Sequence, residues 1–310
     1  MKFLVTGGAG FIGSHIVDAL VKNGDKVTVL DDLSSGTLEN LEGVKDKVDF
    51  IQGSITDPGD VSRAMEGADY VLHQAALRSV PKSLDNPSQY NYVNIDGTLK
   101  ILEEARRRKV KRVVFASSSS IYGEAKTLPS KEDFYPLLIS PYALTKLAGE
   151  YYCRIFSKIH GLETASLRYF NVFGPRQSLE NEYAVVIPKF ITCMLKDEAP
   201  PIHGDGKQTR DFTYVENVVQ ANIKAATTQG IKCEVFNIAC GKTYSVLDVI
   251  KYVNKILKKD IKPKFTPARQ GDVRHTSADI NKAKKLIKLD PKIGFEEGLV
   301  RTIKYFKSEA

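Results

Sequence analysis

Residues 2–32 of the chain read KFLVTGGAGFIGSHIVDALVKNGDKVTVLDD. A short apolar run comes first, closely spaced glycines follow, and apolar residues then recur at helical spacing before a second apolar run. This order predicts a buried parallel strand, a tight turn, a helix and a second strand. Gly7 would permit the turn, Gly10 would let the backbone approach a pyrophosphate, and Gly13 would let the helix lie close to the strand. Free amides at the helix N-terminus would bind the phosphates, so we expect a dinucleotide-binding unit.

The acid at the end of the second predicted strand indicates which dinucleotide binds. Asp31 can accept hydrogen bonds from both hydroxyls of an adenosine ribose, and it would repel a 2′-phosphate. NAD is therefore favoured over NADP. The glycine spacing in TGGAGFIG, with Gly7 and Gly10 three apart, resembles the version used by the extended branch of the short-chain dehydrogenase/reductase superfamily.

Beyond residue 32, strand-like and helix-like patterns alternate along most of the chain. Such alternation predicts an α/β fold with a doubly wound parallel sheet, a Rossmann fold. The pattern breaks at Gly174 and Pro175, where we place the start of a smaller C-terminal substrate lobe. The predicted NAD-binding domain covers 1–173 and regains the chain at about 211–240, and the predicted lobe covers 174–210 and 241–310. Strands are expected at 48–53, 68–76, 112–116, 164–170 and 234–240, and helices at 57–66, 86–108, 141–159, 245–257 and 295–306.

Composition excludes several classes of protein. The chain has 310 residues, is 42% hydrophobic and carries a net charge of +8. Its basic residues are scattered or lie in short runs typical of solvated helix faces, so no nucleic-acid partner is expected. The four cysteines form no CxxC pair, which predicts reduced thiols and no metal site. The glycine loop begins almost at Met1 and no apolar run is long enough to span a membrane, so we expect a cytoplasmic protein with no membrane partner.

A tyrosine and a lysine lie one helical turn apart in the predicted helix that begins at Pro141. Tyr142 and Lys146 would share one face of that helix. A tyrosine normally titrates near pH ~10, so a neighbouring cation must lower its pKa before it can act as a base at neutral pH. Ser117 to Ser120 follow the predicted strand 112–116, at the edge of the sheet that faces the cofactor. The sequence therefore predicts a base, a cation and a hydroxyl beside a bound dinucleotide.

The motifs TGGAGFIG, SSSSIYG, PYALTK and LRYFNVFG together resemble those of the nucleotide-sugar branch of this superfamily, above all the UDP-hexose 4-epimerases. The resemblance covers essentially the whole chain. It implies that Ser118 holds the sugar 4-oxygen beside the base Tyr142, although a one-place error within 117–120 is possible, and that Lys146 holds the nicotinamide ribose. Asn94 would support the lysine. An acid contacts the adenine in this family where the present chain has Ser54, so the chain departs from the pattern there.

The same resemblance implies two sets of binding residues. The cofactor set is Gly7, Gly10, Phe11, Ile12, Gly13, Asp31, Ser35, Gly36, Ser54, Ile55, Gln74, Ala75, Ala76, Asn94, Tyr142, Lys146 and Tyr169. The substrate set is Ser118, Tyr142, Asn171, Val186, Arg210, Arg269, Asp272 and Thr276. Arginines in this second set suit the oxygens of a diphosphate.

The reaction implied is inversion at C4 of a UDP-hexose. Tyr142 would remove the 4-hydroxyl proton while the C4 hydride passes to NAD, and the 4-keto sugar would turn over before the hydride returns. Thr276 is small where stricter epimerases carry a tyrosine, which predicts that UDP-N-acetylglucosamine and UDP-N-acetylgalactosamine are accepted besides UDP-glucose and UDP-galactose. The helices at 86–108 and 140–160 would lie on one face of the sheet, and related enzymes pair two such helices across a two-fold axis, so a homodimer is expected.

Alternative functions stay open at this point. A UDP-glucuronate 4-epimerase would need a cation for the carboxylate, which Arg78 or Lys82 could supply. A dehydratase needs an acid pair where the chain has Ser119 and Ser120, and the absence of a glutamate there also counts against a decarboxylase. A nucleotide sensor that has lost its chemistry is disfavoured by the intact set of Ser118, Tyr142 and Lys146.

Overall fold

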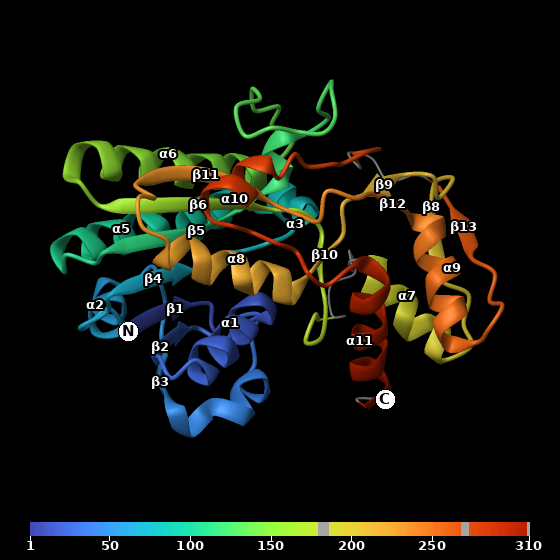
Figure 1. The fold of residues 1–310 in the computed structure, drawn as a ribbon, viewed down its shortest axis with the longest axis horizontal. Helices are drawn as coiled ribbons and strands as arrows, with labels where there is room; N and C mark the ends of the chain where they lie inside the picture. The colour runs from blue at the N-terminus through green and yellow to red at the C-terminus, as the bar shows by residue number, and fades with distance from the viewer. Residues whose placement is uncertain (179–185, 268–272, 309–310) are drawn as a thin grey trace.

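The computed structural model describes residues 1–178, 186–267 and 273–308, and at its centre lies a seven-stranded parallel sheet (Figure 1). The strands lie in the order β11-β6-β5-β4-β1-β2-β3. Their bounds are β1 (Lys2–Thr6), β2 (Lys26–Asp31), β3 (Val48–Gln52), β4 (Tyr70–His73), β5 (Arg112–Ser118), β6 (Glu163–Tyr169) and β11 (Cys233–Ile238). The order reverses between β1 and β4, where the carboxyl ends of the strands border a ligand crevice in sheets of this kind. The predicted doubly wound α/β fold is confirmed.

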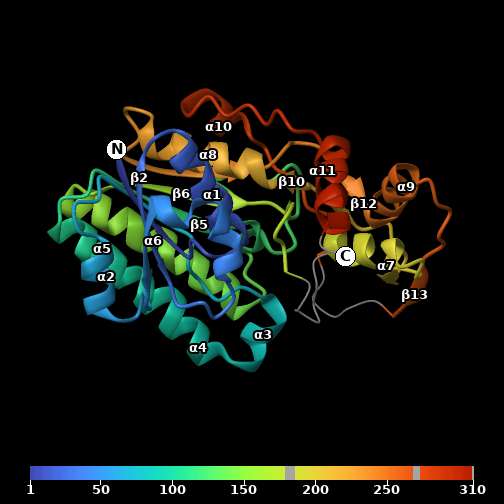
Figure 2. The same ribbon diagram turned by 90° about the horizontal axis from the view of Figure 1, so that it is seen from below.

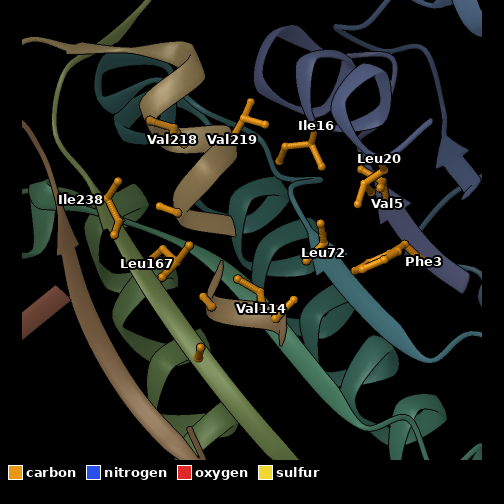
Figure 3. Close-up of a cluster of buried hydrophobic side chains, with 14 of the residues drawn as sticks. Phe3, Val5, Ile16, Leu20, Leu72, Val114, Leu167, Val218, Val219 and Ile238 are labelled. Atoms are coloured by element: carbon orange, nitrogen blue, oxygen red, sulfur yellow. The ribbon is translucent and has the colours of Figure 1, made fainter. Parts of the chain in front are cut away.

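Helices cover both faces of the sheet, and successive strand residues pack on opposite sides. Phe3 and Val5 of β1 join one core cluster, whereas Leu4 between them joins another. The first cluster lies under α1 (Phe11–Lys22) and α8 (Val215–Thr227), and Figure 3 shows Ile16 and Val219 within it. The second lies under α2 (Pro58–Ala64), α5 (Gly97–Arg107) and α6 (Pro141–His160). Burial on both faces explains why the strands read as apolar runs rather than alternating patterns.

A further core cluster belongs to the three helices beyond the carboxyl edge of the sheet, which lie side by side in Figure 2. These are α7 (Val186–Leu195), α9 (Val246–Leu257) and α11 (Phe295–Ser308). Ser245 begins α9 with a capping box, in which its side chain accepts from the Asp248 amide and the Asp248 carboxylate accepts from the Ser245 amide. The predicted cap at Ser245 is confirmed, while the predicted domain boundaries stay a prediction.

One segment within the predicted smaller lobe also packs against the sheet. The helix α10 (Asn281–Leu286) contacts β11, and Ala283, Ile287 and Leu289 join the core cluster under α8. A bridge between Ser130 and Ala278 leads the chain to this position. Among the described residues β11 is an edge strand of the sheet, and the contact with α10 covers part of it.

The helix predicted at 86–108 is interrupted. Its parts are α4 (Pro87–Asn91), the π-helical turn η2 (Tyr92–Asp96) and α5, and a further helix, α3 (Val80–Asp85), precedes them. Ser79 caps α3 by accepting from the Lys82 amide. The π-helical turn carries Asn94 inward, where it is 2% exposed. A 3.6-residue periodicity does not reveal such a turn, which is common at functional sites.

Two further observations bear on the sequence predictions. Within the described ranges, no helix combines the length and apolar character that crossing a membrane requires. All four cysteines are free thiols, with Cys153 and Cys193 buried and the other two partly exposed.

The closest backbone approach at the glycine loop gives a first prediction. A Cβ atom on residue 13 would lie 2.0 Å from the Gly7 carbonyl oxygen, so Gly13→Ala must push the helix away from the turn. We expect a loss of about 1–3 kcal/mol in the free energy of unfolding, measured by urea titration, together with weakened NAD binding. Gly43→Ala is the control, because a Cβ there meets nothing within 4 Å. Equal stability of both variants would contradict the close-packing account.

Candidate active site

The turn between β1 and α1 is built largely from glycines, so backbone rather than bulky side chains lines the cavity there. Gly7 adopts a φ of +67° and donates its amide to Leu30 O at 2.8 Å, which fixes the turn against β2. Gly10 is the N-cap of α1 and provides no side-chain cap, and the first turn of α1 carries no acid. The helix N-terminus therefore keeps donors and a positive partial charge for an anionic ligand.

Asp31 ends β2 and braces this turn. Its Oδ2 accepts from the Ala9 amide and its Oδ1 from the Leu33 amide, both at 2.9 Å. Burial raises the pKa of the Asp31 carboxyl, while the two amide hydrogen bonds oppose that shift. Each oxygen retains a lone pair, so a ribose diol can bind the same carboxylate. The loop thus fits the phosphates and ribose of a dinucleotide.

A cavity of about 240 Å³ runs from this loop to Tyr142 and joins most of the predicted cofactor residues. The predicted residues in its lining are Gly7, Gly10, Phe11, Ile12, Gly13, Asp31, Ser35, Ile55, Gln74, Ala75, Ala76, Tyr142, Lys146 and Tyr169. A larger cavity of about 830 Å³ lies between α6, β11 and residues 131–136. It contains neither the glycine loop nor Tyr142, so we assign the chemistry to the smaller one.

Three predicted cofactor residues lie outside that lining. A Cβ on Gly36 would lie 2.6 Å from the carbonyl carbon of Ala9, so Gly36 packs against the glycine loop. Ser54 bonds with the hydroxyl of Thr56, while its neighbours Gly53 and Ile55 line the cavity. Asn94 is buried and acts through other groups. These three positions therefore shape the site without facing it.

Asn94 holds the chain segment that follows β4. Its Oδ1 accepts from the Leu77 amide at 2.8 Å, and its Nδ2 donates to Leu77 O and to Thr145 Oγ1, both at 3.0 Å. The resemblance implies support of Lys146. In the structure the contact is with Thr145, the preceding residue of α6, so any support of the lysine is indirect.

Lys146 projects from α6 into an aromatic and carbonyl-lined position. Its Nζ donates to Ala116 O at 2.8 Å and lies 5.1 Å from the ring centroid of Phe115 and 5.9 Å from that of Tyr142. Burial lowers the pKa of Lys146 to about 7. The ammonium therefore gains and loses its proton around neutral pH.

Tyr142 differs from the sequence expectation in the groups that tune it. Burial raises the pKa of its phenol, and a hydrogen bond with Ser118 and the charge of Arg78 lower it. The sequence predicts Lys146 as the cation that favours the phenolate. In the structure Lys146 donates to a backbone carbonyl with its Nζ 5.9 Å from the Tyr142 ring centroid, and Ser118 and Arg78 are the groups that oppose the rise of the Tyr142 pKa on burial.

Tyr169 lines the cavity in a hydrogen-bonded triad. Its single hydroxyl proton is shared between Gln74 Oε1 at 3.1 Å and Asn222 Oδ1 at 3.0 Å, and Gln74 Nε2 donates to the same Asn222 oxygen. Burial raises the pKa of Tyr169. The phenol is thus a neutral donor that fixes the Gln74 side chain beside the cavity.

Two predicted substrate residues meet at the edge of the smaller lobe. Thr276 Oγ1 donates to Asn171 Oδ1 at 3.3 Å, and the Thr276 amide donates to Thr209 O beside Arg210. Arg210, in β9 (Thr209–Arg210), donates to the carbonyls of Thr209 and Arg274. Val186 is the first residue of α7 and packs on the lobe core. Arg269 and Asp272 lie outside the described residues.

The sequence profile of a family described as NAD dependent epimerase/dehydratase matches residues 3–239, which contain the glycine loop, the serine run and α6. The chain belongs to this family. The predicted family resemblance and the predicted cofactor NAD are thereby confirmed. Because the first turn of α1 has no side-chain cap and no acid, and Asp31 is held beside the glycine loop, this member retains groups that suit NAD.

Three solved structures from the family superpose on the whole chain. A UDP-N-acetylglucosamine 4-epimerase from Methanobrevibacter ruminantium M1, in complex with UDP-N-acetylmuramic acid, is 43% identical with a TM-score of 0.96, covering 100% of this chain and 99% of that one. A UDP-glucose 4-epimerase from Thermotoga maritima with UDP-glucose is 41% identical with a TM-score of 0.95, at the same coverage. A UDP-glucuronic acid 4-epimerase from Bacillus cereus, with UDP-glucuronic acid and NAD, is 35% identical with a TM-score of 0.93, covering 100% of both chains.

Some residues of the candidate site were not predicted from the sequence in the role that the structure indicates. Arg78 lines the cavity and acts on Tyr142, although the sequence raises it only as a partner for a substrate carboxylate. Ser117 lines the cavity beside Ala116, and the buried Asn222 of α8 bonds the lining residue Gln74 from 148 positions away in the sequence. The position of Arg78 directly after a strand end was the available signal, whereas nothing local marks Asn222. In the described part of the chain, no group of His, Cys, Asp and Glu side chains is placed to hold a metal ion.

Proposed function

We propose that the protein is an NAD-dependent epimerase that inverts C4 of UDP-hexoses, both the N-acetylated pair and the UDP-glucose and UDP-galactose pair. The observation that carries this proposal is the meeting of Tyr142, Ser118 and Lys146 beside the dinucleotide cavity. These three side chains provide a proton acceptor, a hydroxyl that holds it and a buried cation at one place.

Each residue of the site has a separate role in the proposed reaction. Burial raises the pKa of the Tyr142 phenol, and the hydrogen bond with Ser118 and the positive charge of Arg78 limit that rise. Tyr142 would take the 4-hydroxyl proton of the sugar and later return it. The glycine loop and Asp31 would hold NAD, which would supply the hydride acceptor and donor. Tyr169 and Gln74 also line the cavity, and their hydrogen bond fixes both side chains.

The acceptance of N-acetylated sugars rests on the pair Thr276 and Asn171. Their 3.3 Å contact places a small side chain next to a predicted substrate ligand, where a tyrosine would fill the space that an acetamido group needs. The 43% identity with a UDP-N-acetylglucosamine 4-epimerase supports the same breadth.

A UDP-glucuronate 4-epimerase is the second candidate, and Arg78 is the observation in its favour. This arginine lines the cavity near Tyr142 and could bind a sugar carboxylate. Dehydration and decarboxylation are disfavoured, because the carboxylates among the described lining residues are Asp31 and Asp32, at the ribose end. The non-catalytic sensor is the least favoured reading.

The base assignment gives a direct test. Tyr142→Phe should lower the turnover of UDP-galactose and of UDP-N-acetylgalactosamine by ~10²–10⁴, because the proton acceptor is removed. Folding and NAD binding should persist, as measured by circular dichroism and NAD titration. Tyr135→Phe serves as control, since that side chain is 83% exposed. Near wild-type turnover by Tyr142→Phe would remove Tyr142 from the reaction and overturn the proposed function.

Substrate breadth is tested at Thr276. Thr276→Tyr should lose turnover of the N-acetylated pair by roughly 10²-fold relative to UDP-galactose, because the larger ring occupies the acetamido space. Thr276→Ser keeps a small hydroxyl side chain and should retain both activities. A wild-type protein that converts UDP-galactose and leaves UDP-N-acetylglucosamine untouched would reduce the proposal to the narrower enzyme.

We further propose that two copies pair through α6. An apolar stripe on this helix is exposed, with Leu144 at 52%, Tyr151 at 54%, Ile155 at 49% and Ile159 at 72%. A second copy can bury the same stripe around a two-fold axis. Light scattering should give a dimer that Ile155→Asp dissociates and Val300→Asp, on the exposed face of α11, leaves intact. A monomeric wild type would refute the pairing.

A further inference from the structure

The helix α6 carries a third functional group at the same spacing as the first two. Tyr142, Lys146 and Glu150 follow one another at four-residue intervals, so they lie along one face of the helix. All three contact the end of β5. Tyr142 bonds with Ser118, Lys146 donates to Ala116 O, and Glu150 accepts from Ser117 Oγ. Three successive strand residues are therefore each held by one turn of α6.

Glu150 is in turn held by a buried arginine from the next strand. Arg168 of β6 lies opposite Ser117 in register, and its Nε and Nη2 donate to the two Glu150 oxygens at 2.9 and 2.8 Å. Both side chains are only 5% exposed. This two-pronged geometry restricts the Glu150 carboxylate to one orientation.

The same arginine reaches the other end of the serine run. Its guanidinium lies 4.8 Å from the ring centroid of Tyr122, the last residue of the short helix η3 (Ser119–Tyr122). The Tyr122 hydroxyl donates to Asn237 Oδ1 on β11 at 2.6 Å. Arg168 thus anchors Ser117 through Glu150 and anchors Tyr122 directly, with Ser118 lying between the two anchor points.

Stability alone does not account for such a pair. Removing two charges from water costs free energy, and a buried ion pair is often no more stabilising than apolar residues of the same volume. A satisfied buried polar network can fix the positions of the residues between its members more precisely than apolar packing can.

We propose that Glu150 and Arg168 are positioning residues, which act through Ser117 and Tyr122 to keep the Ser118 hydroxyl on the phenol of Tyr142. Neither residue touches substrate or cofactor in this assignment. The kinetic part of the inference rests on the proposed epimerase function, whereas the effect on the Tyr142 phenol can be measured without a substrate.

A positioning role of Glu150 and a purely electrostatic role predict opposite shifts in the pKa of Tyr142 when the Glu150 charge is removed. Loss of the Ser118 hydrogen bond raises the pKa of Tyr142, because that bond favours the phenolate. Loss of the Glu150 negative charge alone would lower the pKa, since a nearby anion disfavours the phenolate. The groups that face Tyr142 are Arg78, Tyr90 of α4, Ser118 of β5, Lys146 of α6 and Tyr169 of β6.

Glu150→Gln is the first test variant, because it keeps the shape and removes the charge that engages Arg168. We expect the phenolate difference spectrum of Tyr142, obtained by subtracting the Tyr142→Phe variant in each background, to move to higher pH. We also expect kcat of the NAD-loaded enzyme to fall by about 10²-fold with a KM for UDP-galactose within a few-fold of wild type. Arg168→Lys should behave in the same way, since an ammonium keeps the charge but loses the two-pronged contact.

The matched control is Glu163→Gln. Arg112 and Glu163 form an ion pair at 2.6 Å between the same two strands at their opposite ends, far from the serine run. This variant should lose stability without moving the Tyr142 titration or kcat. If Glu150→Gln does not fold, Ser117→Ala cuts the link between the ion pair and the strand and should raise the Tyr142 pKa.

Three outcomes would overturn the proposal. They are a Tyr142 titration unchanged in Glu150→Gln and Ser117→Ala, a shift to lower pH, or a shift of equal size in Glu163→Gln. A wild-type enzyme without activity on any UDP-sugar would defeat the proposed function, and the Tyr142 titration would still decide the positioning role.

Discussion

The contact on which the structure depends is the one between the start of α1 and the turn after β1. No side chain fits there, because a Cβ at Gly13 would collide with the Gly7 carbonyl and one at Gly36 would collide with the backbone of Ala9. Three backbone segments therefore meet without intervening side chains, and hydrogen bonds of the Gly7 amide to Leu30 O and of the Thr37 amide to Ala9 O join them. Asp31 then ties the segments together by accepting from Ala9 and Leu33. The crevice at the carboxyl end of the sheet exists because this corner is so tightly packed.

From that corner the active site follows through α6 and β5. The helix packs on the sheet, so residues at four-residue spacing on its inner face meet the strand end one after another. The residues on this face of α6 both hold the helix against the sheet and form part of the candidate active site. Lys146 illustrates this, since it contacts a strand carbonyl and two aromatic rings while its ammonium titrates near neutral pH.

The sequence predicts those features that periodicity and local turn chemistry determine. The sheet, the glycine turn, Asp31 and the cap at Ser245 all follow from residues close together in the chain. Contacts between distant segments are harder to infer, which is why Asn222 in the Tyr169 triad and the return of residues 281–289 to the sheet have no local signal. The tuning of Tyr142 by Ser118 and Arg78 was missed for a related reason, because helical spacing places Lys146 on the correct face and does not reveal where its ammonium points.

The ion pairs at the two ends of β5 and β6 also bear on how the chain finds its register. Parallel neighbours have no tight turn to set their alignment, and β5 and β6 are separated by the whole of α6. Arg112 faces Glu163 at one end and Ser117 faces Arg168 at the other, in a single alignment. A slip by one residue would separate Arg112 from Glu163 and would move Ser117 away from Glu150, the α6 carboxylate that pairs with Arg168, so misaligned forms are costly. The free-energy cost of leaving buried charges unpaired in other alignments therefore favours the native register as much as the native contacts do.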